Sequence, residues 1–117
     1  MPTRRIPLAA IQDAASAIYT VARRTPLVPL ELSHTGSPRL DGCAVYAKLE
    51  LLQPIGSFKI RGAWNTVRQI PRDDMKDGVW TVSAGNAAQG VALAARTAGV
   101  PCSVMVMDTA PQTKIAA

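Results

Sequence analysis

The feature that most constrains the fold is a strand–helix–strand pattern in the last third of the chain. The apolar runs "VWTVSA" (79–84) and "CSVMVM" (102–107) have the length and composition of strands. Between them, "NAAQGVALAARTAG" (86–99) is typical of a helix that ends at Gly99. This order, with short loops, predicts a right-handed βαβ unit with two parallel strands. Because the strand runs are almost continuously apolar, we expect both faces of the pair to be buried.

The first part of the chain predicts a mixture of helix and short strands. Residues 7–24 space their apolar side chains along one face of a helix. A proline-rich connection follows, with an edge strand expected at residues 30–32, and residues 43–51 alternate as a second strand. Ser57 is well placed to cap a helix at residues 58–70, which a proline then ends.

The charged connector "RDDMKDG" (72–78) is the best candidate for a domain boundary. Residues 1–75 lie before it, and residues 76–117 begin the parallel α/β unit. A single βαβ unit has two strands and leaves both sheet edges open. We therefore expect these 117 residues to be one part of a larger fold.

The charge of the chain does not point to a nucleic-acid partner. Thirteen basic and eight acidic residues give a formal net charge of +5. The tight basic pairs are Arg4–Arg5 and Arg23–Arg24, and no aromatic residues are interleaved with them. We therefore predict no nucleic-acid binding.

Other classes of site and location are disfavoured in the same way. Neither Cys43 nor Cys102 has a second cysteine or a histidine at metal-ligand spacing, so no metal site is predicted. No stretch approaches the roughly 18 uninterrupted apolar residues of a membrane span, and the N-terminal apolar patch is broken too early for an export signal. We expect a cytoplasmic protein that does not bind membranes.

A lysine in "PIGSFKIRGAWN" (54–65) is the first candidate for chemistry. Lys59 stands at the start of a predicted helix, between Phe58 and Ile60. Such neighbours would remove water from its ammonium group and lower its pKa. A partly neutral lysine attacks carbonyl groups, so an aldehyde cofactor would suit it. The alternative is an ordinary helix lysine that extends to solvent.

The second candidate is the loop "SAGNAAQG" (83–90), which joins the end of a strand to the start of a helix. Open α/β sheets bind ligands at this place, because backbone N–H groups and the positive end of the helix meet there. The loop matches neither GxGxxG nor GxxxxGK, so it suits a carboxylate or a phosphate without indicating a nucleotide. Alternatively, Gly85 and Asn86 form a plain turn before a helix.

Together, the two stretches resemble a known family. "KLELLQPIGSFKIRGA" and "SAGNAAQGVALAA", with "TPLVPL" and "APQTKIAA", are similar to the fold-type II pyridoxal-phosphate enzymes, in their threonine/serine dehydratase and serine racemase branch. The resemblance implies an α/β fold of the tryptophan synthase beta type, a parallel sheet with helices on both faces. Residues 1–75 would belong to the large domain with its Schiff-base lysine, and residues 76–117 would begin the small domain with its asparagine loop. It also implies a homo-oligomer at full length.

The resemblance also implies roles for particular residues. Lys59 matches the lysine that binds the aldehyde of pyridoxal 5'-phosphate and later moves the α-proton of the substrate, and Phe58 matches the side chain beside the pyridine ring. Gln89 stands at a position near that ring, and Asn86 also reaches the phenolic oxygen of the cofactor. The positions that match the substrate-carboxylate loop are Ser83, Gly85, Asn86 and Ala87.

The implied activity is that of an ammonia-lyase (dehydratase) of amino-acid metabolism, which converts a small hydroxy amino acid to a 2-oxo acid and ammonia. Racemases of this branch often have a serine at the position of Ala84, so the alanine favours the dehydratase. Many members have a histidine at Ala87, which leaves the substrate preference open. The glycine-rich loop for the cofactor phosphate has no counterpart in the sequence, so we expect this polypeptide alone to be inactive or nearly so. Two alternatives remain open: a racemase-type enzyme, and a non-catalytic α/β remnant that binds a small anion or a protein partner.

Overall fold

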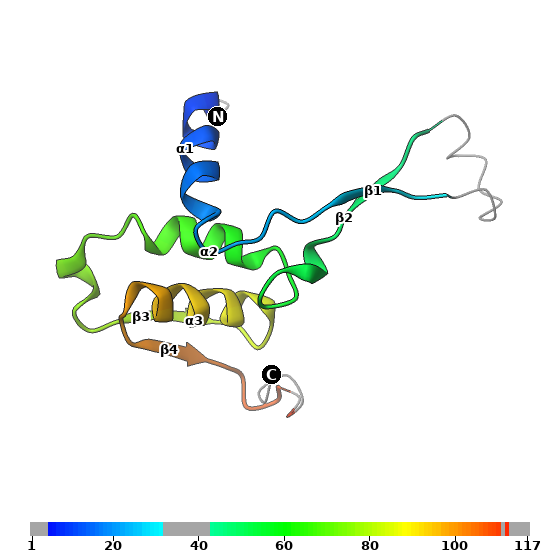
Figure 1. The fold of residues 1–117 in the computed structure, drawn as a ribbon. Helices are drawn as coiled ribbons and strands as arrows, with labels where there is room; N and C mark the ends of the chain where they lie inside the picture. The colour runs from blue at the N-terminus through cyan, green and yellow to red at the C-terminus, as the bar shows by residue number, and fades with distance from the viewer. Residues whose placement is uncertain (1–4, 32–42, 111, 113–117) are drawn as a thin grey trace.

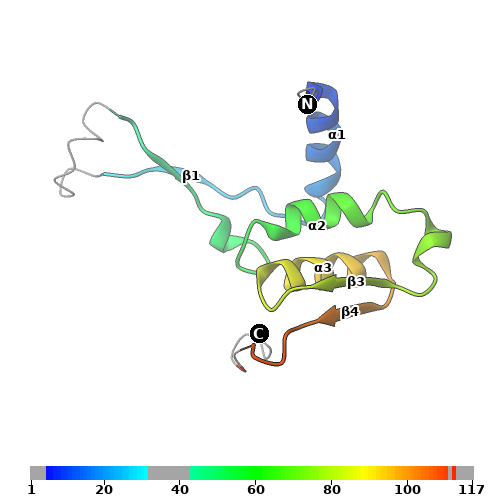
Figure 2. The same cartoon turned by 180° about the vertical axis from the view of Figure 1, so that it is seen from behind.

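The computed structural model describes residues 5–31, 43–110 and 112, which form helices stacked on a small parallel sheet. In Figures 1 and 2, α1 stands on α2, α2 lies beside α3, and α3 covers the strands β3 and β4. The elements, in chain order, are α1 (Leu8–Ile18), β1 (Leu27–Pro29), β2 (Tyr46–Lys48), η2 (Glu50–Leu52), α2 (Lys59–Val67), η3 (Arg72–Met75), β3 (Val79–Val82), α3 (Asn86–Ala98) and β4 (Cys102–Met105).

The predicted βαβ unit is confirmed. β3 pairs in parallel with β4, in a register that runs from Val79 opposite Cys102 to Val82 opposite Met105, and α3 connects the two strands. The helix ends as the sequence predicts, because Gly99 adopts a left-handed conformation with φ of 70°. That conformation suits glycine, which has no Cβ atom to clash with the backbone.

The prediction that both faces of the strand pair are buried is wrong for the described residues. Trp80 is 72% exposed and Val82 is 59% exposed, whereas Val79 and Thr81 are half-buried. Side chains alternate between the two faces of a strand, so α3 covers one face and leaves the other open. The described residues thus place a helix on one face of this sheet, not on both.

The N-terminal elements are shorter than the sequence predicts. α1 ends at Ile18 instead of near residue 24, and the first strand lies at Leu27–Pro29 instead of 30–32, of which residue 32 lies outside the described residues. β1 pairs antiparallel with β2, and this pair extends away from the helices (Figure 1). The second strand is limited to β2 because the chain turns into η2 directly after it.

The core lies between α2 and α3. A buried cluster of Val67, Met75 and Ala94 is surrounded by half-buried apolar side chains from both helices and from β3. α2 begins at Lys59, and its N-cap residue is Phe58, without a side-chain cap. The prediction of Ser57 as the cap is therefore wrong, and its buried hydroxyl has no hydrogen-bond partner within the described part of the chain.

Candidate active site

The two stretches that the sequence singles out begin neighbouring helices at the same end of the molecule. Lys59 is the first residue of α2, and Asn86 is the first residue of α3. The two helices pack side by side and run in the same direction, so both begin where β3 ends (Figures 1 and 2). The predicted lysine and the predicted anion loop therefore share one end of the α2–α3 pair.

Lys59 lies on the wall of an open cavity of about 500 Å³. Its ammonium nitrogen is 5.1 Å from the centre of the Phe58 ring, and Ala87, Val91 and Trp80 also line this cavity. The surroundings are mainly apolar, so a flat aromatic molecule could contact Phe58 while its carbonyl group reaches the amine.

The sequence expectation that its neighbours remove water from Lys59 is wrong for this structure. Lys59 is exposed and Phe58 is 57% exposed, whereas Ile60 is fully buried. α2 starts at Lys59, and the side chain of its first turn that points into the core is that of Ile60. The lysine is therefore available to a ligand and also to water.

The loop before α3 contains a hydrogen bond between two nearby residues. The backbone N–H of Gly85 donates to the hydroxyl oxygen of Ser83, at 3.2 Å. Gly85 is the N-cap residue in an extended conformation, and its carbonyl accepts the N–H of Ala88 at 2.9 Å. The first N–H groups of a helix have no acceptor inside the helix, so this loop presents donors to an anion.

The predicted site residues divide between two cavities. Phe58, Lys59 and Ala87 line the cavity of about 500 Å³ described above. A second cavity, of about 720 Å³, is lined by Ser83, Ala84, Gly85 and Gln89, together with Pro54, Ile55 and Arg96 among others. Asn86 is exposed at the first position of α3. The structure thus brings these residues to one region but does not enclose them in a single pocket.

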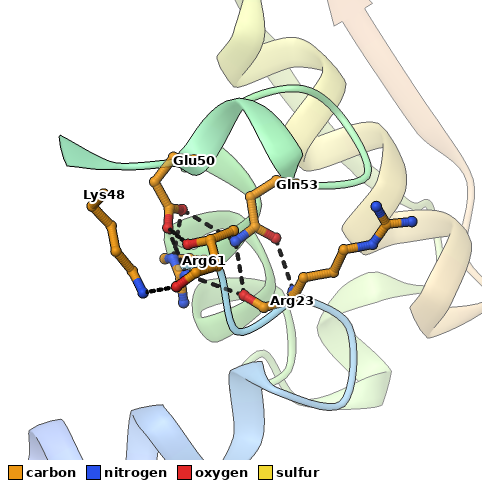
Figure 3. Close-up of polar contacts among 6 residues, drawn as sticks. Arg23, Lys48, Glu50, Gln53 and Arg61 are labelled. Carbon is orange, nitrogen blue, oxygen red and sulfur yellow. Dashed lines mark hydrogen bonds and ion pairs between the residues drawn. The ribbon is translucent and has the colours of Figure 1, made fainter. Parts of the chain in front are cut away.

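A polar network around Arg61, two residues after Lys59, was not found from the sequence (Figure 3). Arg61 donates from Nε and Nη2 to the two carboxylate oxygens of Glu50, each at 2.7 Å. Thr25 donates its hydroxyl to Glu50 at 2.5 Å, and the Lys48 ammonium group donates to the Thr25 carbonyl. The ion pair therefore ties the first turn of α2 to η2 and to the segment after α1.

Gln53 completes this network from a buried position. Its side-chain oxygen accepts the N–H of Arg23 at 2.8 Å, and its nitrogen donates to the Arg23 carbonyl at 2.9 Å (Figure 3). The same nitrogen donates to Glu50 at 3.2 Å. The available sequence signal was a glutamate and a glutamine inside the apolar stretch "KLELLQ", since buried polar side chains need partners.

The ion pair shifts the protonation of both partners. The pKa of Glu50 falls from 4.5 to about 2, mainly because of the hydrogen bonds from Arg61. Burial opposes this shift by raising the pKa, and the hydrogen bond from the Thr25 hydroxyl lowers it further. The Glu50 bonds in turn raise the pKa of Arg61. The pair therefore stays charged at neutral pH and holds the start of α2 in place.

The groups around Lys59 and the loop fit an aldehyde cofactor that carries an anionic group. A primary amine binds an aldehyde, the Phe58 ring offers an aromatic surface, and the free N–H groups of two helix starts attract anions. A carboxylate of a substrate would suit the same donors. The described residues contain no cluster of three or more His, Cys, Asp or Glu side chains that could hold a metal ion. Among the described helices, none has the length and apolar character needed to cross a membrane.

A scan of family models places this chain near one group of enzymes. Residues 18–117 match the model described as "Pyridoxal-phosphate dependent enzyme". The chain is 43% identical to the L-threonine ammonia-lyase of Geobacter sulfurreducens over 110 residues, which are 94% of this chain and 26% of that protein. Against the L-threonine ammonia-lyase of Thermotoga maritima, the identity is 40% over the same shares of each chain.

Solved structures give the same result for the fold. The processed threonine deaminase isoform 2 of Solanum lycopersicum matches with a TM-score of 0.74 and 38% identity, over 99% of this chain and 34% of that one. Maize serine racemase matches with a TM-score of 0.81 and 32% identity, over 97% of this chain and 33% of that one. The expected α/β fold of the pyridoxal-phosphate enzymes is confirmed, and the described residues show a helix on one face of its parallel sheet. The chain spans between about a quarter and a third of the length of these proteins.

Proposed function

The chain belongs to the pyridoxal-phosphate dependent enzymes, as its sequence resemblance implied, and on this premise we propose that it forms part of a threonine/serine dehydratase. Such an ammonia-lyase converts a small hydroxy amino acid to a 2-oxo acid and ammonia. The observation that carries the proposal is that Lys59 and Ala87 line the same cavity, since Ala87 lies in the first turn of α3 and belongs to the predicted carboxylate loop, residues 83–87. The similar proteins named threonine ammonia-lyase and threonine deaminase support the same reaction.

We assign the roles in this proposal residue by residue. Lys59 binds the aldehyde of pyridoxal 5'-phosphate and moves the α-proton of the substrate, and Phe58 contacts the pyridine ring. Asn86 binds the phenolic oxygen of the cofactor. The substrate carboxylate is held by Ser83, Gly85, Asn86 and Ala87, and the proposal is supported by their position at the start of α3, where the first N–H groups have no acceptor inside the helix.

The mechanism divides the work between the cofactor and the chain. When bound, pyridoxal 5'-phosphate supplies an aldehyde for amines and a conjugated ring that withdraws electrons from the α-carbon. The loop 83–87 binds and orients the carboxylate, and the Lys59 amine accepts the α-proton. The β-hydroxyl group would then leave as water with the proton that Lys59 holds, and hydrolysis would release the 2-oxo acid and ammonia. Because Lys59 is exposed, the described residues do not exclude water from its amine, which fits the expectation that this polypeptide alone has little activity.

A racemase is the second candidate, because maize serine racemase and an aspartate racemase are among the similar structures, with TM-scores of 0.81 and 0.83. Racemisation needs a proton donor on the second face of the substrate. Ala84 lines the larger cavity at the position where the racemases of this branch often have a serine, and its methyl group cannot transfer a proton. We therefore favour the dehydratase. Formation of D-serine from L-serine without a 2-oxo acid would reverse this preference.

The proposal has three further parts that rest on the family resemblance. Residues 1–75 and 76–117 would belong to different domains, although in this structure the cluster of Val67, Met75 and Ala94 packs across that boundary. The full-length enzyme would be a homo-oligomer. It would act in amino-acid metabolism in the cytoplasm.

The experiment that tests the proposal follows cofactor binding at Lys59. The purified chain is mixed with pyridoxal 5'-phosphate, its visible spectrum is recorded, and the adduct is reduced with borohydride and mapped by mass spectrometry. We expect a visible band and a mass increment at Lys59, both absent in Lys59→Ala. Lys76→Ala is the matched control, since Lys76 is an exposed lysine 71% accessible to solvent. Equal labelling of Lys59 and Lys76 would indicate non-specific chemistry and reject the proposed site. Release of a 2-oxo acid from serine or threonine tests the reaction itself.

A further inference from the structure

Gly90 lies where α2 and α3 pack closely against each other. It is buried, and a Cβ atom built on it would be 3.2 Å from both the carbonyl carbon and the carbonyl oxygen of Lys59. The same atom would be 3.3 Å from the Cβ atom of Ala63. These contacts are tighter than nine in ten that real Cβ atoms make, so a neighbour would have to move by a few tenths of an ångström. Because two of the three atoms belong to the backbone, that movement would displace Lys59 itself.

The backbone of Gly90 does not explain why glycine stands there. Gly90 is in the interior of α3, and it is not among the glycines with positive φ. Glycine is a poor helix former in such a position, so its benefit must come from packing. Gly62 in α2 is a useful comparison, since a Cβ atom on it would meet nothing within 4 Å. The missing side chain at Gly90 therefore matters because α2 is so close.

The contact also fixes the two helix starts relative to each other. Gly90 is one helical turn after Asn86, and a Cβ atom added to it would be 3.2 Å from the carbonyl group of Lys59, the residue that begins α2. Helices are stiff over one turn, so a change in spacing at Gly90 moves the loop 83–87 relative to Lys59. The close packing at Gly90 therefore contributes to the separation between the lysine and the anion loop.

We propose that Gly90 is a positioning residue that sets the separation between the Lys59 amine and the loop 83–87. The inference rests on the proposed function, in which the amine and the loop act on the same ligand. A displacement of a few tenths of an ångström weakens reactions that depend on a fixed geometry, and a full ångström can reduce a rate about a hundredfold. For Gly90→Ala we expect the borohydride-trapped adduct at Lys59 to form about tenfold more slowly.

Ala94→Ser is the matched control, because it adds one heavy atom to the same helix interface. Ala94 is fully buried and packs with Val67 and Met75, two turns beyond the start of α2. The 117-residue chain is compared as wild type, Gly90→Ala and Ala94→Ser. For each protein, we would measure the amide NMR chemical shifts, the rate of adduct formation at Lys59 and the pH dependence of the visible band. A loss of stability alone would affect both variants, whereas a change in the band and its pH dependence only in Gly90→Ala indicates positioning.

A double variant separates the two contacts of the added methyl group. Ala63→Gly removes the contact at 3.3 Å but leaves the Lys59 carbonyl in place, so Gly90→Ala with Ala63→Gly should keep most of the slower adduct formation. Full recovery in the double variant would overturn the inference. So would equal rates of adduct formation in Gly90→Ala and in a wild-type chain that does form the adduct at Lys59.

The NMR measurement decides the inference even where the proposed function fails. If the wild-type chain forms no adduct at Lys59, the proposed cofactor chemistry of this chain is rejected. Shifted amide signals over residues 59–63 in Gly90→Ala, with those residues unchanged in Ala94→Ser, would still support the positioning role. Unshifted signals at residues 59–63 would overturn it.

Discussion

Replacing Glu50 with glutamine should remove the stability that its ion pair with Arg61 supplies at neutral pH. The two side chains are 17% and 20% exposed, and both carboxylate oxygens accept bonds of 2.7 Å. These bonds lower the pKa of Glu50 from 4.5 to about 2. A shift of that size is equivalent to about 3 kcal/mol, and partial screening by solvent reduces the expected contribution to about 2 kcal/mol of unfolding free energy.

The sign of the effect follows from the direction of the shift. Because the pKa of Glu50 is lower in the folded state, its contribution is complete above pH about 4.5 and is lost as the pH falls toward about 2. Urea unfolding followed by tryptophan fluorescence should show that wild type and Glu50→Gln differ by about 2 kcal/mol at neutral pH and converge in acid. Asp73→Asn is the control, since Asp73 is 85% exposed and its pair with Lys76 should contribute less than about 0.5 kcal/mol. A difference between wild type and Glu50→Gln that stays constant with pH would refute the electrostatic explanation.

Two further predictions concern stability. Gly62→Ala should raise the unfolding free energy by about 0.5–1 kcal/mol, because its new methyl group meets nothing within 4 Å. Gly99→Ala should lower the unfolding free energy by about 1 kcal/mol, because φ at Gly99 is 70°. Thermal unfolding of both variants checks these opposite signs, and a change of the same sign in both would contradict the argument. Trp64→Phe should lower the unfolding free energy by about 1 kcal/mol and speed amide hydrogen exchange in α1, because it removes the hydrogen bond of 3.2 Å from the indole N–H to the Ala17 carbonyl. Unchanged hydrogen exchange in α1 would show that this bond does not hold α1 to α2.

The parts of the fold that depend on local sequence were predicted best. α3 begins at Asn86 and ends before Gly99 as its sequence indicates, because capping and the left-handed glycine are local effects. The parallel pairing of β3 and β4 also follows from the connection between them. The face of β3 that carries Trp80 could not be predicted, since an apolar run does not say whether a partner covers it in the described part of the chain.

The surroundings of Lys59 depended on contacts between distant residues. Phe58 and Ile60 suggested a dry setting, but only Ile60 is buried, because exposure depends on where α2 starts and what packs against it. The network at Glu50 joins residues from 23 to 61, and no periodic pattern links such distant positions. The sequence therefore pointed to the lysine and the loop that we propose as the site, whereas the groups that hold them in place became visible only in the folded chain.

The common direction of α2 and α3 supports the proposal that this region binds an anionic ligand. Each helix start carries a partial positive charge of about half an elementary charge, and parallel packing brings the two together. Neither first turn contains an Asp or Glu side chain that would offset this charge, although both turns lie within the described residues. The close contact at Gly90 holds these two partial positive charges side by side, so they repel each other when no ligand is bound. A carboxylate or phosphate between the helix starts and solvent would stabilise both charges. A ligand without a negative group would reach the Lys59 amine but would gain nothing from the two helix starts, so binding should discriminate by charge before the amine reacts.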